Sequence, residues 1–494
     1  MTAQTYLAVD LGADSGRVMA GRFVDGRVTL HEVHRFPNGP VHLGESLRWN
    51  ILGLWSEIET GLEKSATEYG NSVVSVGVDT WGVDFVLMTA RGELVGQPYH
   101  YRDRRTAGQM EKAFGRLSRR DIFHQTGLQF MEINSLYQLL AMQETEPHLL
   151  KTADCLLMIP DFFHWCLCGS RVVEFTNATT TQMYHPVHRD WSIDLLRSFE
   201  LPTDIFPQVV DPGTKLGTLR LDIGRRSGLG RISVVAPATH DTGSAVAAVP
   251  LDQTGRTAWA YISSGTWSLI GVEVSEAIIT DDALRMNVTN EGGIDGTFRL
   301  LKNVMGLWLA QSLKRSFSRA GRNYSWDALL RQALEAESMQ SFFDPDHPDL
   351  FSPDNMATAI RELCRRSGQS VPETDGDLVR CAMESLALKY RVVLDDLESL
   401  IGHRIEVIHI VGGGSKNELL NQCTADASKR PVIAGPVEAT AMGNVLTQAK
   451  AAGELSTLAD IRSVVRCSTD CRRYEAAGDD KWDEAYSRFR AIVG

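Results

Sequence analysis

The sequence is poor in cysteine, in net positive charge and in long apolar runs, and each shortage excludes a class of protein. Eight cysteines in 494 residues are too few for a disulfide-stabilised scaffold. A net charge of −12 argues against a nucleic-acid-binding surface, although it is compatible with a local pocket for a nucleotide. No apolar run approaches the roughly 20 residues of a membrane span, and no signal-peptide pattern opens the chain. We therefore expect a cytoplasmic protein with neither a nucleic-acid nor a membrane partner.

The spacing of the cysteines gives no metal site. Cys166 and Cys168 lack a second pair of ligands at zinc spacing, as do Cys467 and Cys471, and the first two are interpreted as small core residues. Cys364 and Cys381 flank a loop, so they are expected to meet across two helices. In a reducing cytoplasm we expect free thiols there.

The length of the chain implies at least two domains. Three strands are predicted near the N-terminus, followed by a helix with apolar residues at helical spacing and a further strand, which indicates an α+β unit. Further along, residues 135–169 are predicted to be helical and 213–230 to be mainly loop. The predicted strands of this part cover 6–9, 17–24, 27–36, 73–79, 85–89 and 232–236, and the helices 50–68 and 242–248.

A second cycle begins with the strand over 232–236 and the helix over 242–248, and it continues with a strand over 258–262, a hydroxyl-rich turn and a strand over 269–272. It is followed by predicted helices over 305–320, 325–337, 354–366 and 375–400, a strand over 405–411 and a helix over 415–429. Two similar cycles indicate an internal duplication with a cleft between the halves. We predict an N-terminal domain over 1–248, a C-terminal domain over 257–450 and a helical tail over 451–494, with a turn near 250–257.

The segment from Asp10 to Arg17 places a carboxylate at the end of an apolar strand, before a turn of small and hydroxyl residues. Such a carboxylate can hold Mg²⁺ through water, and the backbone N–H groups of the turn can bind phosphate. Gly12 and Gly16 are interpreted as positions where the backbone approaches a polyphosphate closely. The segment lacks the Gly-Lys-Ser/Thr of a P-loop, and a simple hairpin is the alternative. Asp14 is expected to face solvent, with metal binding as its alternative.

A second candidate site lies where the strand near 234–236 leads into His240, Asp241 and Thr242. A carboxylate at the start of a helix, in a turn facing the cleft, can accept a proton from a substrate hydroxyl. Thr242 and the helix N–H groups can hold an anion. The alternative is that Asp241 only caps the helix.

Together these segments resemble the FGGY family of carbohydrate kinases over almost the whole chain. The resemblance rests on Asp10–Arg17, Tyr101–Arg105, Asp161–Gly169, His240–Thr242, Ser264–Thr266, Gly412–Gly414 and the run from Asn417 to Gly443. It implies a duplicated ribonuclease-H-like, or actin-like ATPase, α/β fold of two domains with an interdomain cleft. It also implies ATP as co-substrate, Mg²⁺ as cofactor, a small sugar as substrate, and a monomer or homodimer.

The resemblance assigns roles residue by residue. Asp241 is the implied catalytic base, and both Asp10 and Asp241 face Mg²⁺, largely through water. The implied sugar contacts are Gly82, His240, Asp241, Thr242 and Asn303. The implied ATP contacts are Ala13, Asp14, Ser15, Gly16, Arg17, Thr266, Gln311 and Gly413.

Four further stretches resemble the branch of the family that phosphorylates L-rhamnulose at its C1 hydroxyl, in L-rhamnose catabolism. They are Val78–Phe85, Glu174–Gln182, Asn290–Gly293 and Leu301–Trp308. Kinases for L-fuculose, L-xylulose or a polyol are the alternatives within the family. An actin-like ATPase that acts on no sugar is a further alternative, disfavoured because such a protein needs no sugar base at Asp241.

Overall fold

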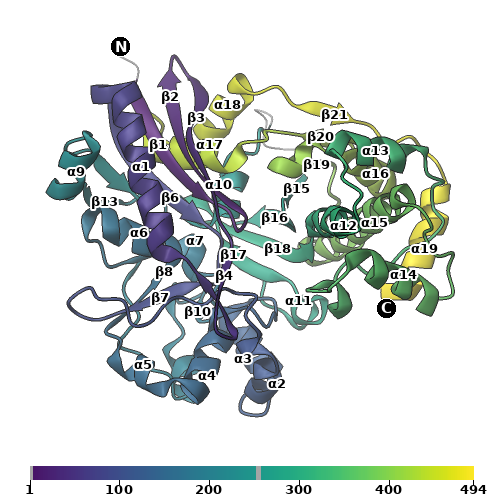
Figure 1. The fold of residues 1–494 in the computed structure, drawn as a ribbon, viewed down its shortest axis with the longest axis horizontal. Helices are drawn as coiled ribbons and strands as arrows, with labels where there is room; N and C mark the ends of the chain where they lie inside the picture. The colour runs from purple at the N-terminus through teal and green to yellow at the C-terminus, as the bar shows by residue number, and fades with distance from the viewer. Residues whose placement is uncertain (1–3, 252–257, 494) are drawn as a thin grey trace. The chain divides into compact units, whose positions relative to one another are not determined.

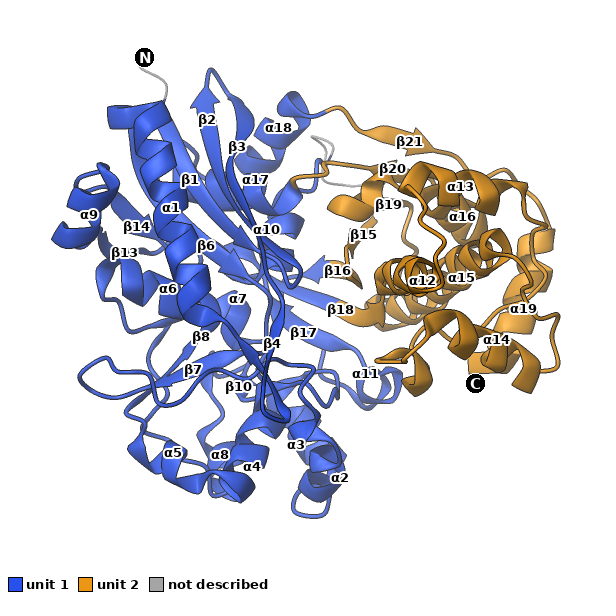
Figure 2. Cartoon of the chain, viewed as in Figure 1, with its two compact units in different colours: residues 1–253, 273–300, 439–469 blue, residues 254–272, 301–438, 470–494 orange. Residues whose placement is uncertain are grey.

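The computed structural model describes residues 4–251 and 258–493. By their internal contacts these residues form two compact units, shown in Figure 2. Unit 1 contains residues 1–253, 273–300 and 439–469, and unit 2 contains residues 254–272, 301–438 and 470–494. The chain therefore passes between the units several times. No helix in the described part of the chain is both long and apolar enough to cross a membrane.

Unit 1 is built on a six-stranded mixed sheet of order β13-β14-β6-β1-β2-β3. The N-terminal strands β1, β2 and β3 pair antiparallel, as the alternating pattern predicts, whereas β1, β6 and β14 run parallel. The carboxyl ends of these three parallel strands therefore share one edge of the sheet. The strands are β1 (Gln4–Leu11), β2 (Ser15–Val24), β3 (Arg27–Pro37), β6 (Val73–Thr80), β13 (Lys215–Thr218) and β14 (Ser233–Val235).

Two helices from distant parts of the chain cover opposite faces of this sheet (Figure 1). On one face, α1 (Ile51–Tyr69) packs closely through Gly61, where a Cβ would lie 2.3 Å from the Val18 side chain of β2. On the other face, Gly21 of β2 leaves room for Val445 of α17 (Ala439–Ala452). Val18 and Gly21 are an odd number of residues apart in one strand, so they point to opposite faces.

The second sheet has seven strands in the order β17-β18-β16-β15-β19-β20-β21. Its strand β15 pairs antiparallel with β16 and parallel with β19, and β19 pairs parallel with β20. The order β18-β16-β15-β19-β20 repeats the order β3-β2-β1-β6-β14 of the first sheet, so the structure contains the predicted duplication. The strands are β15 (Trp259–Ser264), β16 (Trp267–Val274), β17 (Thr289–Gly292), β18 (Phe298–Met305), β19 (Val407–Val411), β20 (Val432–Ala434) and β21 (Arg472–Tyr474).

The remaining elements connect and cover these sheets. In unit 1 the helices are α2 (Gln109–Phe114), α3 (Arg119–Thr126), α4 (Ser135–Thr145), α5 (Pro147–Thr152), α6 (Ile159–Cys168), α7 (Phe175–Ala178), α8 (Ile193–Ser198), α9 (Leu221–Ser227), α10 (Asp241–Ala247), α11 (Asp281–Met286) and α18 (Leu458–Ser468). Its short strands are β4 (Pro40–Leu43), β5 (Ser46–Trp49), β7 (Phe85–Met88), β8 (Cys155–Met158), β9 (Val173–Glu174), β10 (Tyr184–His185), β11 (Asp190–Trp191) and β12 (Val209–Val210). Unit 2 has α12 (Trp308–Arg319), α13 (Trp326–Glu335), α14 (Met356–Arg366), α15 (Asp375–Ile401), α16 (Glu418–Ser428) and α19 (Lys481–Val493).

Four sequence predictions about these elements are wrong in detail. The segment predicted as helix over 135–169 contains strand β8, because its short apolar run pairs with β7. The segment predicted as loop over 213–230 contains β13 and α9, which ends at Gly228 in the left-handed conformation. The helix predicted from residue 305 begins at Trp308, since β18 continues to Met305, and the one predicted from 415 begins at Glu418.

The predicted turn near 250–257 and the predicted start of a C-terminal domain at 257 lie largely outside the described residues. The predicted linear division into 1–248, 257–450 and 451–494 follows the sequence, whereas the compact units interleave these segments. All eight cysteines are free thiols, and those of Cys364 and Cys381 lie in contact with each other.

Candidate active site

Three aspartates of unit 1 gather at the carboxyl edge of its parallel strands. Asp10 is the penultimate residue of β1 and lies opposite Asp79, near the end of β6. Beyond β14, His240 bridges to Thr80, the last residue of β6, and Asp241 begins α10. In open α/β sheets ligands bind at the carboxyl ends of the strands, so this edge is the candidate site.

Asp79 is the most deeply buried of the three carboxylates and was not predicted as a site residue. Its side chain is inaccessible to solvent, and burial together with the negative charge of Asp10 raises its pKa well above the ordinary value. Asn444 of α17 donates to its Oδ2 at 2.5 Å. The buried Oδ1 accepts no hydrogen bond from the described residues. One sequence signal could have identified Asp79: like Asp10, it stands near the end of an apolar strand.

Asp10 is paired with Arg17 across the first hairpin. The Arg17 Nη2 atom lies 2.5 Å from Asp10 Oδ2, and the two residues face each other in the β1–β2 register. Arg17, predicted as a phosphate contact, is therefore held at the strand-end carboxylate in this structure.

The turn between β1 and β2 contains Ala13 and Asp14, with Ser15 starting β2. It is closed by the bond from Gly12 N to the Ser15 carbonyl, and Asp14 is exposed, as expected. At Gly16 a Cβ would lie 2.2 Å from the Phe36 ring. Packing within the sheet therefore requires a glycine here, in addition to the predicted approach of a phosphate.

Asp241 has one carboxylate oxygen held and the other available. Oδ1 accepts from the backbone N of Thr242 at 2.6 Å and from its hydroxyl at 3.2 Å. Oδ2 accepts no hydrogen bond from the part of the chain that the structure describes, and the side chain is 31% exposed. Partial burial raises the pKa of Asp241, the neighbouring His240 opposes this effect and Asp10 adds to it. An accessible carboxylate oxygen with a raised pKa is suited to accept a proton.

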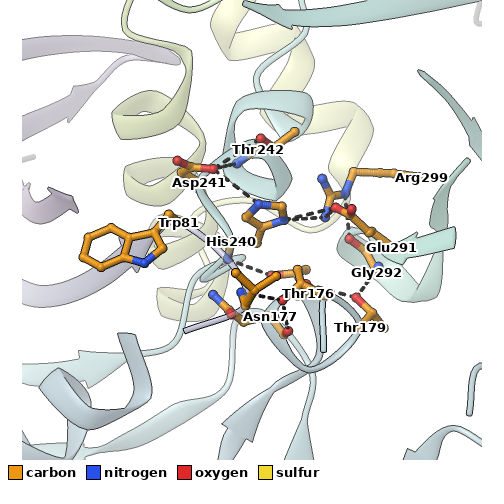
Figure 3. A network of polar contacts seen from close by, with 12 residues as sticks. Trp81, Thr176, Asn177, Thr179, His240, Asp241, Thr242, Glu291, Gly292 and Arg299 are labelled. Carbon is orange, nitrogen blue, oxygen red and sulfur yellow. Dashed lines mark hydrogen bonds and ion pairs between the residues drawn. The ribbon is translucent and has the colours of Figure 1, made fainter. Parts of the chain in front are cut away.

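His240 is held on its backbone and on its ring (Figure 3). Its backbone N donates to the hydroxyl of Thr176, which itself donates to the buried carboxylate of Glu174. The same carboxylate accepts from the backbone N and the hydroxyl of Thr239. The ring of His240 contacts Arg299 and Glu291 at Nδ1, while its Nε2 lies 3.5 Å from Asp241 Oδ1. The sequence motif around Glu174 therefore fixes the turn that presents the candidate base.

Gly82 lies between β6 and β7 in a tightly constrained turn. A Cβ at this position would meet Thr180 at 2.9 Å, and Thr180 accepts a hydrogen bond from the backbone N of Val83. Val83 has a φ of 66°, an unfavourable conformation for a β-branched residue. Strained backbone of this kind is typical of functional sites.

Beside Gly82, the buried carboxylate of Asp84 organises an aromatic cluster. Its Oδ2 accepts from the indole N–H groups of Trp49 and Trp81 and from the backbone N of Tyr101. Its Oδ1 accepts from Gln138. The rings of Trp49 and Trp81 stack at 3.9 Å. In this structure the carboxylate of Asp84 therefore holds these rings in place.

The other predicted contacts, Asn303, Thr266, Gln311 and Gly413, belong to unit 2. Asn303 is a half-buried residue of β18. The carbonyl of Thr266, in the turn between β15 and β16, accepts from the backbone N of Trp308, where α12 begins. Gln311 lies one turn further along α12, and its buried Oε1 accepts no bond from the described residues.

Gly413 belongs to the glycine turn that follows β19. This turn packs on the β15–β16 turn, since a Cβ at Gly414 would overlap the Ser264 hydroxyl. A Cβ at Gly413, by contrast, would meet nothing within 4 Å. The structure thus brings Thr266, Gln311 and the glycine turn into one region of unit 2.

Two residues of the site could not be found from local patterns. Asn444 and Arg299 reach the carboxylate edge from segments distant in the sequence, whereas Glu291, the partner of Arg299, stands in the stretch Asn290–Gly293 that carries the sequence resemblance. Within the described residues, no group of three or more His, Cys, Asp or Glu side chains has the arrangement of a preformed metal site.

Comparison with known proteins identifies relatives over the full length. At 44% identity, covering 99% of both chains, the chain is similar to a protein named rhamnulokinase from Bacteroides thetaiotaomicron. Proteins of the same name from Pectobacterium atrosepticum and Bacillus subtilis are each 41% identical, covering 100% and 94% of this chain and 97% and 93% of their own lengths.

Solved structures with the same fold include xylulose kinase from Lactobacillus acidophilus and glycerol kinase from Plasmodium falciparum. Their TM-scores are 0.81 and 0.79, at 13% and 14% identity, and each match covers 99% of this chain and 97% or 98% of the other. This likeness confirms the predicted two-domain fold. Models of the N-terminal and C-terminal domains of one family match residues 5–248 and 260–452. The chain belongs to the FGGY family of carbohydrate kinases.

Proposed function

We propose that this chain transfers the γ-phosphoryl group of ATP to the C1 hydroxyl of L-rhamnulose, giving L-rhamnulose 1-phosphate and ADP. The observation that carries the proposal is the identity of 40–44% with proteins named rhamnulokinase, over nearly the full chain. The reaction serves L-rhamnose catabolism, in the cytoplasm.

Asp241 is the proposed catalytic base. Its Oδ1 is fixed by Thr242, so the accessible Oδ2 is the atom available to accept the proton of the sugar hydroxyl. The deprotonated oxygen then attacks the γ-phosphorus in line with the leaving ADP. Gly82, His240 and Thr242 line the same edge of unit 1, and we propose that they orient the sugar with Asn303 of unit 2.

ATP is proposed to bind through the first hairpin, at Ala13, Asp14, Ser15, Gly16 and Arg17, and through Thr266, Gln311 and Gly413. The open space at Gly413 and the unsatisfied Oε1 of Gln311 support a flat ligand with N–H donors in unit 2. Kinases of this kind generally use ATP with a divalent metal, which offsets the charge that develops on the transferred phosphoryl group.

The residues at the carboxylate edge fit Mg²⁺ as that metal. Mg²⁺ prefers oxygen ligands, keeps several waters and is usually held by one or two carboxylates together with substrate phosphates. Asp10 and Asp241 supply such carboxylates, and the buried Oδ1 of Asp79, which accepts no hydrogen bond from the described residues, is a further oxygen atom next to Asp10. A site completed by water and phosphate does not require three preformed protein ligands.

The test is a coupled assay of ADP release with L-rhamnulose, L-fuculose, L-xylulose and a polyol. We expect L-rhamnulose to be preferred by about tenfold or more in kcat/KM, because an inverted hydroxyl leaves a buried polar group unpaired, at about 1–3 kcal/mol. NMR of the product should place the phosphate on C1. Equal use of L-fuculose would reduce the proposal to a general sugar kinase, and ADP release independent of sugar would favour an actin-like ATPase.

A further inference from the structure

The motif from Asn290 to Gly293 is not explained by the sugar or ATP contacts proposed above. In the structure it forms strand β17 and the residue after it, next to α7. A Cβ at Gly292 would lie 2.6 Å from the Phe175 ring, and the backbone N of Gly292 donates to Thr179. The motif is thus fixed against the segment that supports the His240 turn, and it carries one ionisable side chain, Glu291.

Glu291 and Arg299 form a buried ion pair beside the ring of His240, at its Nδ1 atom (Figure 3). The Arg299 side chain is inaccessible to solvent and that of Glu291 is 5% exposed. Arg299 Nε donates to the carbonyl of Gly292 at 2.7 Å, which fixes the plane of the guanidinium. Its Nη2 lies 3.2 Å from both Glu291 Oε2 and His240 Nδ1.

A guanidinium has only donors, since it is always protonated in proteins. Two groups lie 3.2 Å from His240 Nδ1: Arg299 Nη2, a donor, and Glu291 Oε2, an acceptor. Only the contact with Arg299 has hydrogen-bond geometry, which favours an Nδ1 that accepts and carries no proton. The proton of the neutral imidazole then resides on Nε2, because the partner of one ring nitrogen decides the state of the other.

We propose that Arg299 is a positioning residue that holds His240 in the Nε2–H tautomer. Glu291 is the counter-ion that offsets the cost of burying the guanidinium charge. The inference rests on the proposed function only for its kinetic consequence. The tautomer itself is a property of the protein without substrate.

The tautomer of His240 affects which oxygen of the proposed base, Asp241, is available to the substrate. Nε2 of His240 lies 3.5 Å from Asp241 Oδ1, the oxygen that also accepts from Thr242. An Nε2–H group directs its partly positive hydrogen toward Oδ1, at a distance longer than a hydrogen bond in this structure, and leaves Oδ2 for the substrate hydroxyl. The other tautomer would direct a lone pair at a carboxylate and would repel it.

The first experiment measures the tautomer in the wild-type protein. Histidine ring ¹⁵N shifts, recorded at neutral pH without ligands, distinguish a protonated nitrogen from one with a lone pair. The chain has 13 histidines, so the His240 signals are assigned by their loss in a His240→Gln variant. We expect His240 to carry its proton on Nε2. A proton on Nδ1, donated to Glu291, would overturn the proposal whatever the kinase activity proves to be.

The second experiment measures kinetics and stability in variants. Arg299→Gln should lower kcat about 10–100-fold, as loss of an orienting partner does in comparable sites, with KM for ATP unchanged. Arg299→Lys should recover part of the loss because it keeps a charged donor. Arg462→Gln is the matched control, since Arg462 forms a mostly buried pair with Glu273 in unit 1.

The outcomes separate positioning from simple stability. A folded Arg299→Gln variant with normal kcat would overturn the proposal, as would an equal loss of kcat in Arg462→Gln. If Arg299→Gln does not fold, Glu291→Gln takes its place, and the wild-type ¹⁵N spectrum still decides the tautomer. A wild-type protein that shows the expected tautomer but phosphorylates no sugar would contradict the proposed function and leave this inference standing.

Discussion

Replacing Asp241 by Asn separates the proposed base from a simple helix cap. The Asn side chain keeps an oxygen for the two hydrogen bonds from Thr242 and puts an NH₂ group where Oδ2 now lies. The variant cannot accept a proton, so kcat should fall about 10²–10⁴-fold, which corresponds to about 3–5 kcal/mol in the barrier. ATP should still bind with unchanged affinity.

The stability of the same variant gives an independent reading. Burial disfavours the charged form of Asp241, which is why its pKa is raised. A neutral isostere removes this penalty, so the melting temperature of Asp241→Asn should be equal to or higher than that of the wild type. A carboxylate that only caps the helix would give the opposite pair of results, because the helix dipole favours a negative charge there by about 0.3–1 kcal/mol.

The assay is coupled ADP release with saturating sugar, combined with calorimetric ATP binding and thermal unfolding. The matched control is Asp375→Asn, which changes the first residue of α15 and its ion pair with Arg322. We expect this control to keep its turnover and to lose a little stability. Near-normal turnover of Asp241→Asn, with lower stability, would refute the assignment of Asp241 as the base.

Three other perturbations test separate parts of the structure. A chelator should abolish activity, and added Mg²⁺ or Mn²⁺ should restore it. The Asp10→Ala variant should lower kcat far more than it lowers the affinity for the sugar. Full activity of Asp10→Ala at saturating Mg²⁺ would contradict the proposed role of Asp10. Burial raises the pKa of Asp84 from 3.8 to about 6, so its contribution to stability is present below about pH 4 and is lost as the pH rises through about 6. Relative to Asp84→Asn, the wild type should therefore lose about 3 kcal/mol of unfolding free energy between about pH 4 and about pH 7, measured by denaturant titration, and a constant difference would argue against the shift. Gly16→Ala places a Cβ 2.2 Å from the Phe36 ring and should lower the free energy of unfolding by about 1–3 kcal/mol. Gly12→Ala, whose nearest neighbour would be 3.4 Å away, is the control, and equal melting temperatures would refute the packing argument.

Local sequence patterns predict the elements whose signal lies within a few residues. The alternation over 29–36 predicts β3 correctly, because one face of that strand is wet. Four apolar residues at 155–158 do not distinguish a strand from a buried helix, and only their pairing with β7 decides it. Glycines are ambiguous in the same way: the motif around Gly16 predicts the close approach of a phosphate, and only the structure shows that Phe36 leaves no room for a Cβ there.

The candidate site shows the same limit. Asp10 and Asp241 stand in recognisable local motifs, so they could be proposed from the sequence. Arg299 could not be proposed in this way, because its partner His240 is 59 residues away and the sequence around Arg299 does not indicate a buried charge. Asn444 is 365 residues from Asp79, and only the packing of α17 on the first sheet brings the two together.

The late position of α17 in the sequence has a consequence for biosynthesis. At about 5–20 residues per second, a ribosome needs about 20–70 s to proceed from Asp79 to Asn444. During this interval the nascent first sheet lacks the helix that covers one of its faces, including the position where Val445 packs on Gly21. Unit 1 is therefore completed only after most of unit 2 has been synthesised, and a nascent chain that stops before residue 439 is expected to need chaperone protection.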